Sequence, residues 1–210
     1  MSGSAIVPRW KPTFVTELKR AVPCHLKGMA MLDGRPKCVA CFADTNTPEG
    51  WRDHKREGGC LVDNESNEII VRGFSMPHSP RVHNGRIWLL DSGRGALVDV
   101  DPNSGRTKIV TPLPGYPRGM TLVGRYAFIG LSQARESKTF GDVAVVEQLQ
   151  NRQCGVWCVD TLSGHIVGYL EFEQTVAEVF DVQLLFGFPY PAIIGFAKDT
   201  VERACVMPPL

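Results

Sequence analysis

Four side chains of this 210-residue chain could act together in chemistry: His25, His78, Arg118 and Asp181. Two imidazoles and a carboxylate are a sufficient ligand set for Zn²⁺ or Fe²⁺, so we predict His25, His78 and Asp181 as ligands of a divalent metal. A guanidinium can hold a carboxylate or phosphate through paired hydrogen bonds, so Arg118 is predicted to bind an anionic substrate. On this hypothesis His78, Arg118 and Asp181 are the catalytic residues of a lyase-type or lactonase-type reaction.

Further candidate binding residues are charged and lie in or near long loops. One loop contributes Arg52, another contributes Arg135 and Glu136, and Arg81 follows three residues after His78. Binding residues often lie on loops that a rigid scaffold positions, so we expect the two loops to form a lid or rim over the site. The alternative is that both loops are solvated and that each histidine only hydrogen-bonds its own turn or strand end.

The elements that position these residues are indicated by a turn that occurs three times. Asp63–Asn67, Asp101–Gly105 and Asp160–Gly164 share the pattern Asp-x-x-Ser followed by Asn or Gly, and each follows a short apolar run. The aspartate is expected to accept backbone N–H bonds, and the last residue to adopt a positive φ. The first two turns are about 40 residues apart, and removing an insertion of roughly 20 residues from the next interval restores that period.

The clearest repeat covers residues 75–110. Asn84-Gly85 predicts a tight hairpin turn after a first strand. We expect further strands at Arg86–Leu90, Ala96–Val100 and Arg106–Val110. Four short strands in about 40 residues match one propeller blade. The predicted fold is therefore all-β, a β-propeller-like arc of about four antiparallel four-stranded blades, with a β-sandwich as the rival architecture.

We predict one domain over residues 1–210. Its expected parts are a lead strand in residues 1–20, repeats at about 21–71, 72–110, 111–170 and 175–207, and an insertion at 132–153 that is helical over 142–150. The last repeat is expected to open with a strand at 178–185 and to continue with strands at 192–196 and 201–206. A lead strand at Trp10–Val15 would complete the last, partial blade. Without that closure the arc is incomplete or open, and it would self-associate through its edge strands.

In a propeller the first strand of each blade lines the central channel. Aligning the four expected first strands places one residue of each at a common level: Lys27, His78, Arg118 and Phe180. The next level is occupied by Gly28, Ser79, Gly119 and Asp181. The candidate residues would therefore meet at one mouth of the channel.

Composition narrows the class of protein. The net charge of +1 gives no electrostatic reason for binding nucleic acid or an anionic membrane. No apolar run approaches the roughly 18 residues of a membrane span, and no secretion signal is visible, so we expect a cytoplasmic protein with reduced cysteines. Cys38-x-x-Cys41 is not predicted to bind zinc, because strand alternation turns the two thiols to opposite faces. The P-loop, dinucleotide and serine-hydrolase motifs are missing from the sequence.

Four sequence motifs are similar to one family of bacterial conserved hypothetical proteins. They occupy residues 24–30, 50–55, 75–81 and 130–136. The family is known as a domain of unknown function with a propeller-like fold, and the resemblance extends from about Trp10 to Val206. It implies that the chain is the C-terminal portion of a longer family member, and that Lys27 stands where the family usually has asparagine. It implies a fold but no reaction, so a non-enzymatic protein-interaction module remains the alternative to a small-molecule site.

Overall fold

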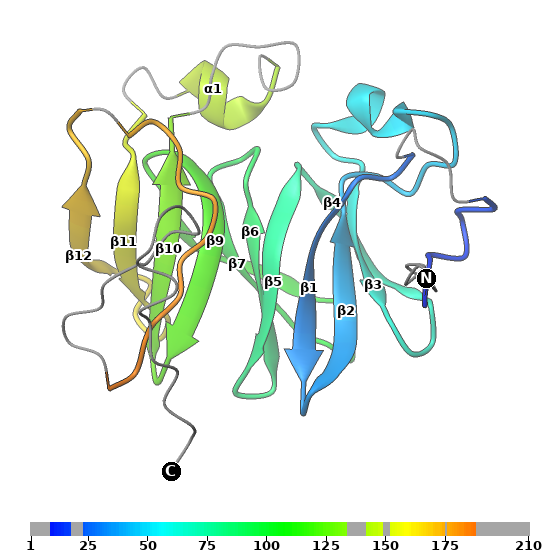
Figure 1. The fold of residues 1–210 in the computed structure, drawn as a ribbon, viewed down its shortest axis with the longest axis horizontal. Helices are drawn as coiled ribbons and strands as arrows, with labels where there is room; N and C mark the ends of the chain where they lie inside the picture. The colour runs from blue at the N-terminus through cyan, green and yellow to red at the C-terminus, as the bar shows by residue number, and fades with distance from the viewer. Residues whose placement is uncertain (1–8, 18–22, 134–141, 149–151, 175, 188–210) are drawn as a thin grey trace, which may run out of the picture.

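The computed structural model describes residues 9–17, 23–133, 142–148, 152–174 and 176–187. These residues form three antiparallel four-stranded sheets with almost no helix (Figure 1). The first sheet consists of β1 (Leu26–Leu32), β2 (Arg35–Cys41), β3 (Gly59–Asp63) and β4 (Ile69–Phe74). The second consists of β5 (Pro77–His83), β6 (Arg86–Asp91), β7 (Ala96–Val100) and β8 (Thr107–Pro112). The third consists of β9 (Tyr116–Val123), β10 (Tyr126–Ser132), β11 (Gly155–Asp160) and β12 (Ile166–Glu171). The predicted all-β class is confirmed.

Within each sheet the strands are paired in sequence order, so the first and fourth strands form the two edges. The first strands lie side by side, with β5 in contact with both β1 and β9 (Figure 1). Each first strand also has an irregular register with its neighbour at a corresponding place. The shifts fall between Leu26 and Met29 in β1, between His78 and Arg81 in β5, and between Pro117 and Met120 in β9. Such bulges bend a strand and redirect its side chains.

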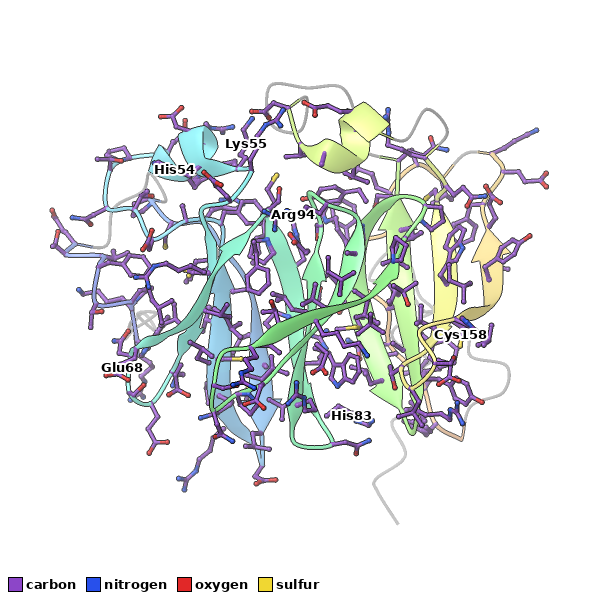
Figure 2. All side chains as sticks on the ribbon, turned by 180° about the vertical axis from the view of Figure 1, so that it is seen from behind. His54, Lys55, Glu68, His83, Arg94 and Cys158 are labelled. Carbon is purple, nitrogen blue, oxygen red and sulfur yellow. The ribbon has the colours of Figure 1, made fainter. Side chains whose placement is uncertain are left out.

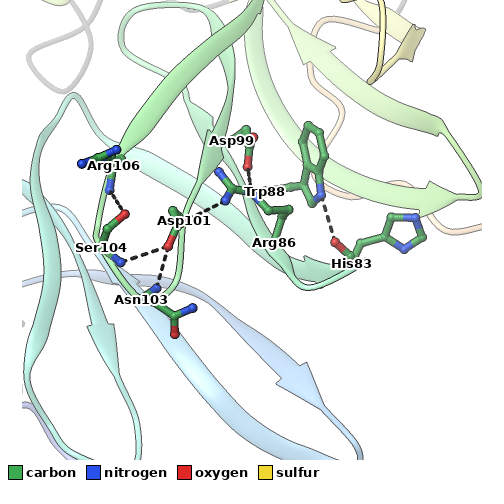
Figure 3. A network of polar contacts seen from close by, with 8 residues as sticks. All are labelled: His83, Arg86, Trp88, Asp99, Asp101, Asn103, Ser104 and Arg106. Carbon is green, nitrogen blue, oxygen red and sulfur yellow. Dashed lines mark hydrogen bonds and ion pairs between the residues drawn. The ribbon is translucent and has the colours of Figure 1, made fainter.

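The outer turns have the predicted geometry. Asp101 accepts backbone N–H bonds from Asn103 and Ser104, both at 2.9 Å, and Gly105 has a φ of +66° (Figure 3). The aspartate also receives a hydrogen bond from Arg86 at the start of β6. The other two turns are built in the same way, with Asp63 paired to Lys37 and Asp160 paired to Arg125. A local hydrogen-bond pattern thus ends the third strand of every described sheet.

Apolar side chains fill the two spaces between neighbouring sheets. Ala30, Cys38 and Leu61 of the first sheet pack with Leu89 and Val98 of the second. A second cluster joins the other face of the second sheet to the third, and it includes Trp88, Leu90, Leu97, Met120, Ile129 and Trp157. Burying this apolar area fixes the order of the three sheets.

The two cysteines of the Cys38-x-x-Cys41 motif occupy opposite faces of β2, as predicted. Cys38 belongs to the core between the first and second sheets. Cys41 packs instead with Cys24 and Cys60 on the other face. A strand places successive side chains on alternate faces, so residues three apart cannot share one.

Two insertions, one between β2 and β3 and the predicted one between β10 and β11, lie at the same end of the sheets (Figure 1). The first contains a short 3₁₀ helix, η1 (Gly50–His54), and the second contains α1 (Ala144–Gln148) within the predicted helical region (Figure 1). Lys55 Nζ is 2.6 Å from a carboxylate oxygen of Asp142, which joins the two insertions. Figure 2 shows Lys55 and Arg94 at this end, where Arg94 donates a hydrogen bond to the Arg56 carbonyl oxygen.

The predicted lead strand at Trp10–Val15 is wrong. Residues 9–17 form no strand; they turn at Thr13 and Phe14 and lie against the turn between β3 and β4. The Asn67 side chain donates to the Lys11 carbonyl oxygen and accepts from the Thr13 amide. The segment therefore covers the outer side of the first sheet and does not complete a last blade.

The predicted opening strand of a fourth repeat, at residues 178–185, is also wrong. Residues 176–187 form no strand, although Ser132 Oγ exchanges hydrogen bonds with the backbone of Val179. Two further predicted strands, at residues 192–196 and 201–206, lie outside the described residues. No helix in the described part of the chain is both long and apolar enough to cross a membrane.

Candidate functional site

A cavity of about 220 Å³ lies where the first strands of the three sheets meet. Its wall combines cations, imidazoles and apolar side chains: His25, Lys27, Phe42, Trp51, Arg52, Met76, His78 and Arg118. A larger depression of about 670 Å³ lies at the opposite ends of the first sheet's hairpins, where residues in and beside the β1–β2 and β3–β4 turns, such as Asp33, Arg35 and Glu65, line it. The smaller cavity is lined by four of the residues that the sequence predicts to be functional: His25, Arg52, His78 and Arg118.

Three of the four residues that are predicted to share one level of the channel lie together, next to the bulges of the first strands. Lys27 of β1, His78 of β5 and Arg118 of β9 all line the cavity. Phe180 lies just outside it, with the Arg118 guanidinium carbon 4.3 Å from its ring centroid. The second predicted level also assembles, because the Gly119 amide donates to Ser79 Oγ at 3.1 Å and Gly119 lies against the Asp181 backbone.

His78 is a buried, neutral imidazole with a defined tautomer. It is only 5% exposed, and its Nδ1 lies 2.9 Å from the Met76 carbonyl oxygen. Burial lowers the pKa of His78 to about 3, and the nearby Arg118 and Lys27 charges contribute. The ring is therefore neutral at pH 7, and Nδ1 carries the proton that it donates to Met76. Nε2 is left as a hydrogen-bond acceptor.

His25 is the second neutral imidazole. Burial, followed by the charges of Lys27 and Arg52, lowers the pKa of His25 to about 4. Its ring lies 4.8 Å from that of Phe42 and 4.6 Å from that of Trp51, measured between centroids. These rings form one aromatic side of the cavity.

The three cations of the cavity differ in their partners. The Arg52 guanidinium lies over the Trp51 ring and forms two hydrogen bonds to Glu49, of 3.1 and 3.2 Å. Arg118 has the Glu178 carboxylate 3.9 Å away. Lys27 has no carboxylate partner within the described ranges, and burial together with the Arg118 charge lowers its pKa. An anion in the cavity would relieve the penalty that burial places on the Lys27 charge.

Backbone strain is concentrated around the site. His25, Met76 and Ser79 have φ values of +50°, +48° and +50°, a region that costs residues with a side chain free energy. Two of these residues line the cavity, and Ser79 follows His78. Strain of this kind persists where the surrounding structure holds a particular geometry in place.

Asp181 and Arg81 are not part of the cavity wall. They face one another at 3.5 Å, and Asp181 also accepts a hydrogen bond from Gln183. Across the described residues, no three His, Cys, Asp or Glu side chains come together in a group that could hold a metal ion. The predicted ligand set of His25, His78 and Asp181 is therefore not assembled, since the Asp181 carboxylate is engaged by Arg81.

Of the three predicted loop residues, one lines the cavity and two lie outside the described part of the chain. Arg52 does line the cavity, as expected for a rim residue. Arg135 and Glu136 lie outside the described residues. The sequence did not identify the apolar wall of Phe42, Trp51 and Met76. Phe42 and Met76 adjoin strands and look like ordinary core, and Trp51 lies in the 3₁₀ helix of a long loop.

A protein-family model described as "Domain of unknown function (DUF4915)" matches residues 2–194. The chain belongs to this family. The family assignment agrees with the sequence motifs. Three of the four motifs supply cavity residues: His25 and Lys27 from residues 24–30, Trp51 and Arg52 from residues 50–55, and Met76 and His78 from residues 75–81. No curated protein matches the chain.

Solved structures similar to this DUF4915 member are distant. The computationally designed Ika4 protein has a TM-score of 0.45 and 10% identity, covering 80% of this chain and 83% of that one. The designed Ika8 protein has a TM-score of 0.42 and 10% identity, covering 75% and 40%. A structure from a study of two prolyl endopeptidases has a TM-score of 0.40 and 14% identity, covering 68% and 19%. With TM-scores below 0.5, none of these likenesses carries an argument about function.

Proposed function

We propose that the three sheets are neighbouring blades of a propeller-like arc, and that the cavity between their first strands binds a small organic monoanion, a carboxylate. The blade arrangement is supported by the side-by-side first strands and by the equivalent bulge in each of them. The observation that carries the binding proposal is the convergence of Lys27, Arg52 and Arg118 on one cavity, to whose wall the described residues contribute no carboxylate.

The balance of charge favours a monoanion over a dianion. Among the residues that the structure describes, three cations and two imidazoles line the cavity, and both imidazoles are neutral at pH 7. Glu178 and Glu49 lie outside the wall but offset two of the cations, Arg118 and Arg52. One positive charge is left over, that of Lys27, and one carboxylate would balance it.

The size and wall of the cavity favour a small organic ligand. A volume of about 220 Å³ equals that of roughly seven water molecules at liquid density. Phe42, Trp51 and Met76 offer apolar contact to a short carbon skeleton, while the cations hold its charged end. Sites for small molecules commonly combine an apolar wall with a few convergent polar groups.

Titration calorimetry with acetate, propionate, lactate and inorganic phosphate tests this proposal. We expect saturable binding of the carboxylates, weakened roughly tenfold or more in Lys27→Met, because a charge-assisted hydrogen bond contributes about 1.5–3 kcal/mol. Lys108→Met is the matched control, since it removes the same charge from an exposed position on β8. No saturable binding by any carboxylate, or equal affinity in the two variants, would refute the proposal.

A second candidate function is protein interaction through edge strand β12. Val167, Tyr169 and Leu170 are 55%, 67% and 59% exposed there, which is unusual for an apolar run. An uncovered edge strand can pair with another chain, including a second copy. Light scattering after size exclusion tests this: self-association that disappears in Leu170→Lys supports it, and a concentration-independent monomer contradicts it.

A further inference from the structure

We infer that the carboxylate bound in this cavity also carries a hydroxyl group, which donates a hydrogen bond to His78 Nε2. The inference rests on the proposed function and makes it more specific, since it names the ligand class as small hydroxy acids.

The hydrogen bonds of His78 define what the ligand must supply. Its Nδ1–H is committed to the Met76 carbonyl oxygen at 2.9 Å. Its ring edge contacts are with Phe42 and Tyr116, whose ring centroids lie 5.1 and 5.6 Å from the imidazole. In the part of the chain that the structure describes, no donor is bonded to Nε2. Because the imidazole lines the cavity, its one uncommitted polar atom is available to a ligand.

A neutral donor suits this position better than a charged one. His78 is surrounded by the positive charges of Lys27 and Arg118, which already disfavour a second proton on the ring. An ammonium group on the ligand would meet the same repulsion. A hydroxyl supplies a proton for Nε2 without adding charge.

The strand order places the acceptor between two cations. β5 lies between β1 and β9, so His78 is flanked by Lys27 on one side and Arg118 on the other. A hydroxyl and a carboxylate on neighbouring carbon atoms would satisfy the acceptor and a cation together. A ligand without the hydroxyl would leave the buried acceptor unpaired, which is how a polar site rejects the analogue that lacks the group.

The experiment measures affinity for three pairs of monocarboxylic acids that differ only by a hydroxyl: lactate and propionate, glycolate and acetate, 2-hydroxybutyrate and butyrate. In the unmodified chain we expect the hydroxy acid of each pair to bind about tenfold tighter or more. His78→Phe should abolish the preference while retaining carboxylate binding, and His78→Gln, which supplies an amide oxygen, should retain part of it. His83→Phe is the control on the same strand, because His83 bonds the Gly124 carbonyl oxygen away from the cavity.

The outcomes separate this inference from the proposed function. If no acid binds, both fail; if the members of each pair bind equally, only the hydroxyl assignment fails. A preference that survives His78→Phe also overturns the assignment to His78. Histidine ¹⁵N NMR of the unmodified chain gives a readout that needs no variant. Lactate should shift the Nε2 resonance of His78 and propionate should leave it in place, and equal shifts would contradict the inference.

Discussion

Replacing Gly119 by alanine would test how residues 176–187 are held against β9, the strand that carries Arg118. Gly119 has a φ of +72°, and a Cβ at this position would lie 2.2 Å from the Asp181 Cα and 2.7 Å from the Val182 nitrogen. Both are backbone atoms, so the clash cannot be relieved by rotating a side chain. Either β9 or the segment must move by roughly 1.3–1.8 Å to reach ordinary van der Waals separation.

Two costs contribute to the expected destabilisation. An alanine in the left-handed region costs about 1–2 kcal/mol. Overpacking a closed contact adds about 1–3 kcal/mol. Gly124→Ala is the matched control, because Gly124 lies in the turn after the same strand with a φ of +55° and has nothing within 4 Å of its Cβ position. We therefore expect a loss of about 2–5 kcal/mol for Gly119→Ala and about 1–2 kcal/mol for Gly124→Ala.

Urea unfolding followed by circular dichroism gives both free energies of unfolding, and hydrogen exchange reports on the segment itself. The amide of Val179, which donates to Ser132 Oγ at 2.9 Å, should exchange faster in Gly119→Ala than in Gly124→Ala. If the two variants lose the same stability and residues 176–187 keep their protection, the contact between Gly119 and Asp181 does not hold the segment. The reasoning would then be refuted.

Three further predictions concern acid stability, a turn and the insertions. The pKa of His78 is about 3 in the folded chain and near 6.5 in the unfolded chain, so between these pH values only the unfolded chain binds this proton. Acidification below pH 6.5 should therefore lower the free energy of unfolding by about 1.4 kcal/mol per pH unit. His78→Gln should reduce that slope in urea titrations at pH 6 and pH 4.5, and an unchanged slope would exclude His78 as its source. The Ser104 and Asn103 amides hold the pKa of Asp101 at about 2, below its ordinary 3.8. Asp101→Asn should therefore lower the melting temperature at pH 7, with the difference disappearing as the pH falls through 2; a difference that persists in acid would contradict this. Lys55→Met removes the ion pair to Asp142 and should speed tryptic cleavage after Arg152 relative to Lys108→Met, whereas equal rates would show that the pair does not anchor the second insertion.

Local hydrogen bonding made much of the fold readable from the sequence. An aspartate, a serine and a final Asn or Gly lie within five residues of each other, so the hydrogen bonds that close each outer turn are local, although a basic side chain from earlier in the chain also binds the aspartate. The hairpin at Asn84-Gly85 is local in the same sense, with φ values of +50° and +71°. Because these signals repeat along the chain, the predicted first strands could be aligned with one another. That alignment placed Lys27, His78 and Arg118 at the same level of the expected channel.

Tertiary structure decided what surrounds that level. Trp51 reaches the cavity where its amide donates to the Pro23 carbonyl oxygen, just before β1, and Phe42 reaches it as the residue after β2. Asp181 lies outside the cavity wall, where its carboxylate faces Arg81. The lead segment and residues 176–187 failed to form their predicted strands, since their contacts are with surfaces far away in the sequence. A strand pattern shows which residues alternate between the two faces of a sheet. It does not show which cation pairs with a carboxylate, whether an imidazole is protonated, or which side chains line a cavity. These properties depend on distances that are set only when the sheets pack together.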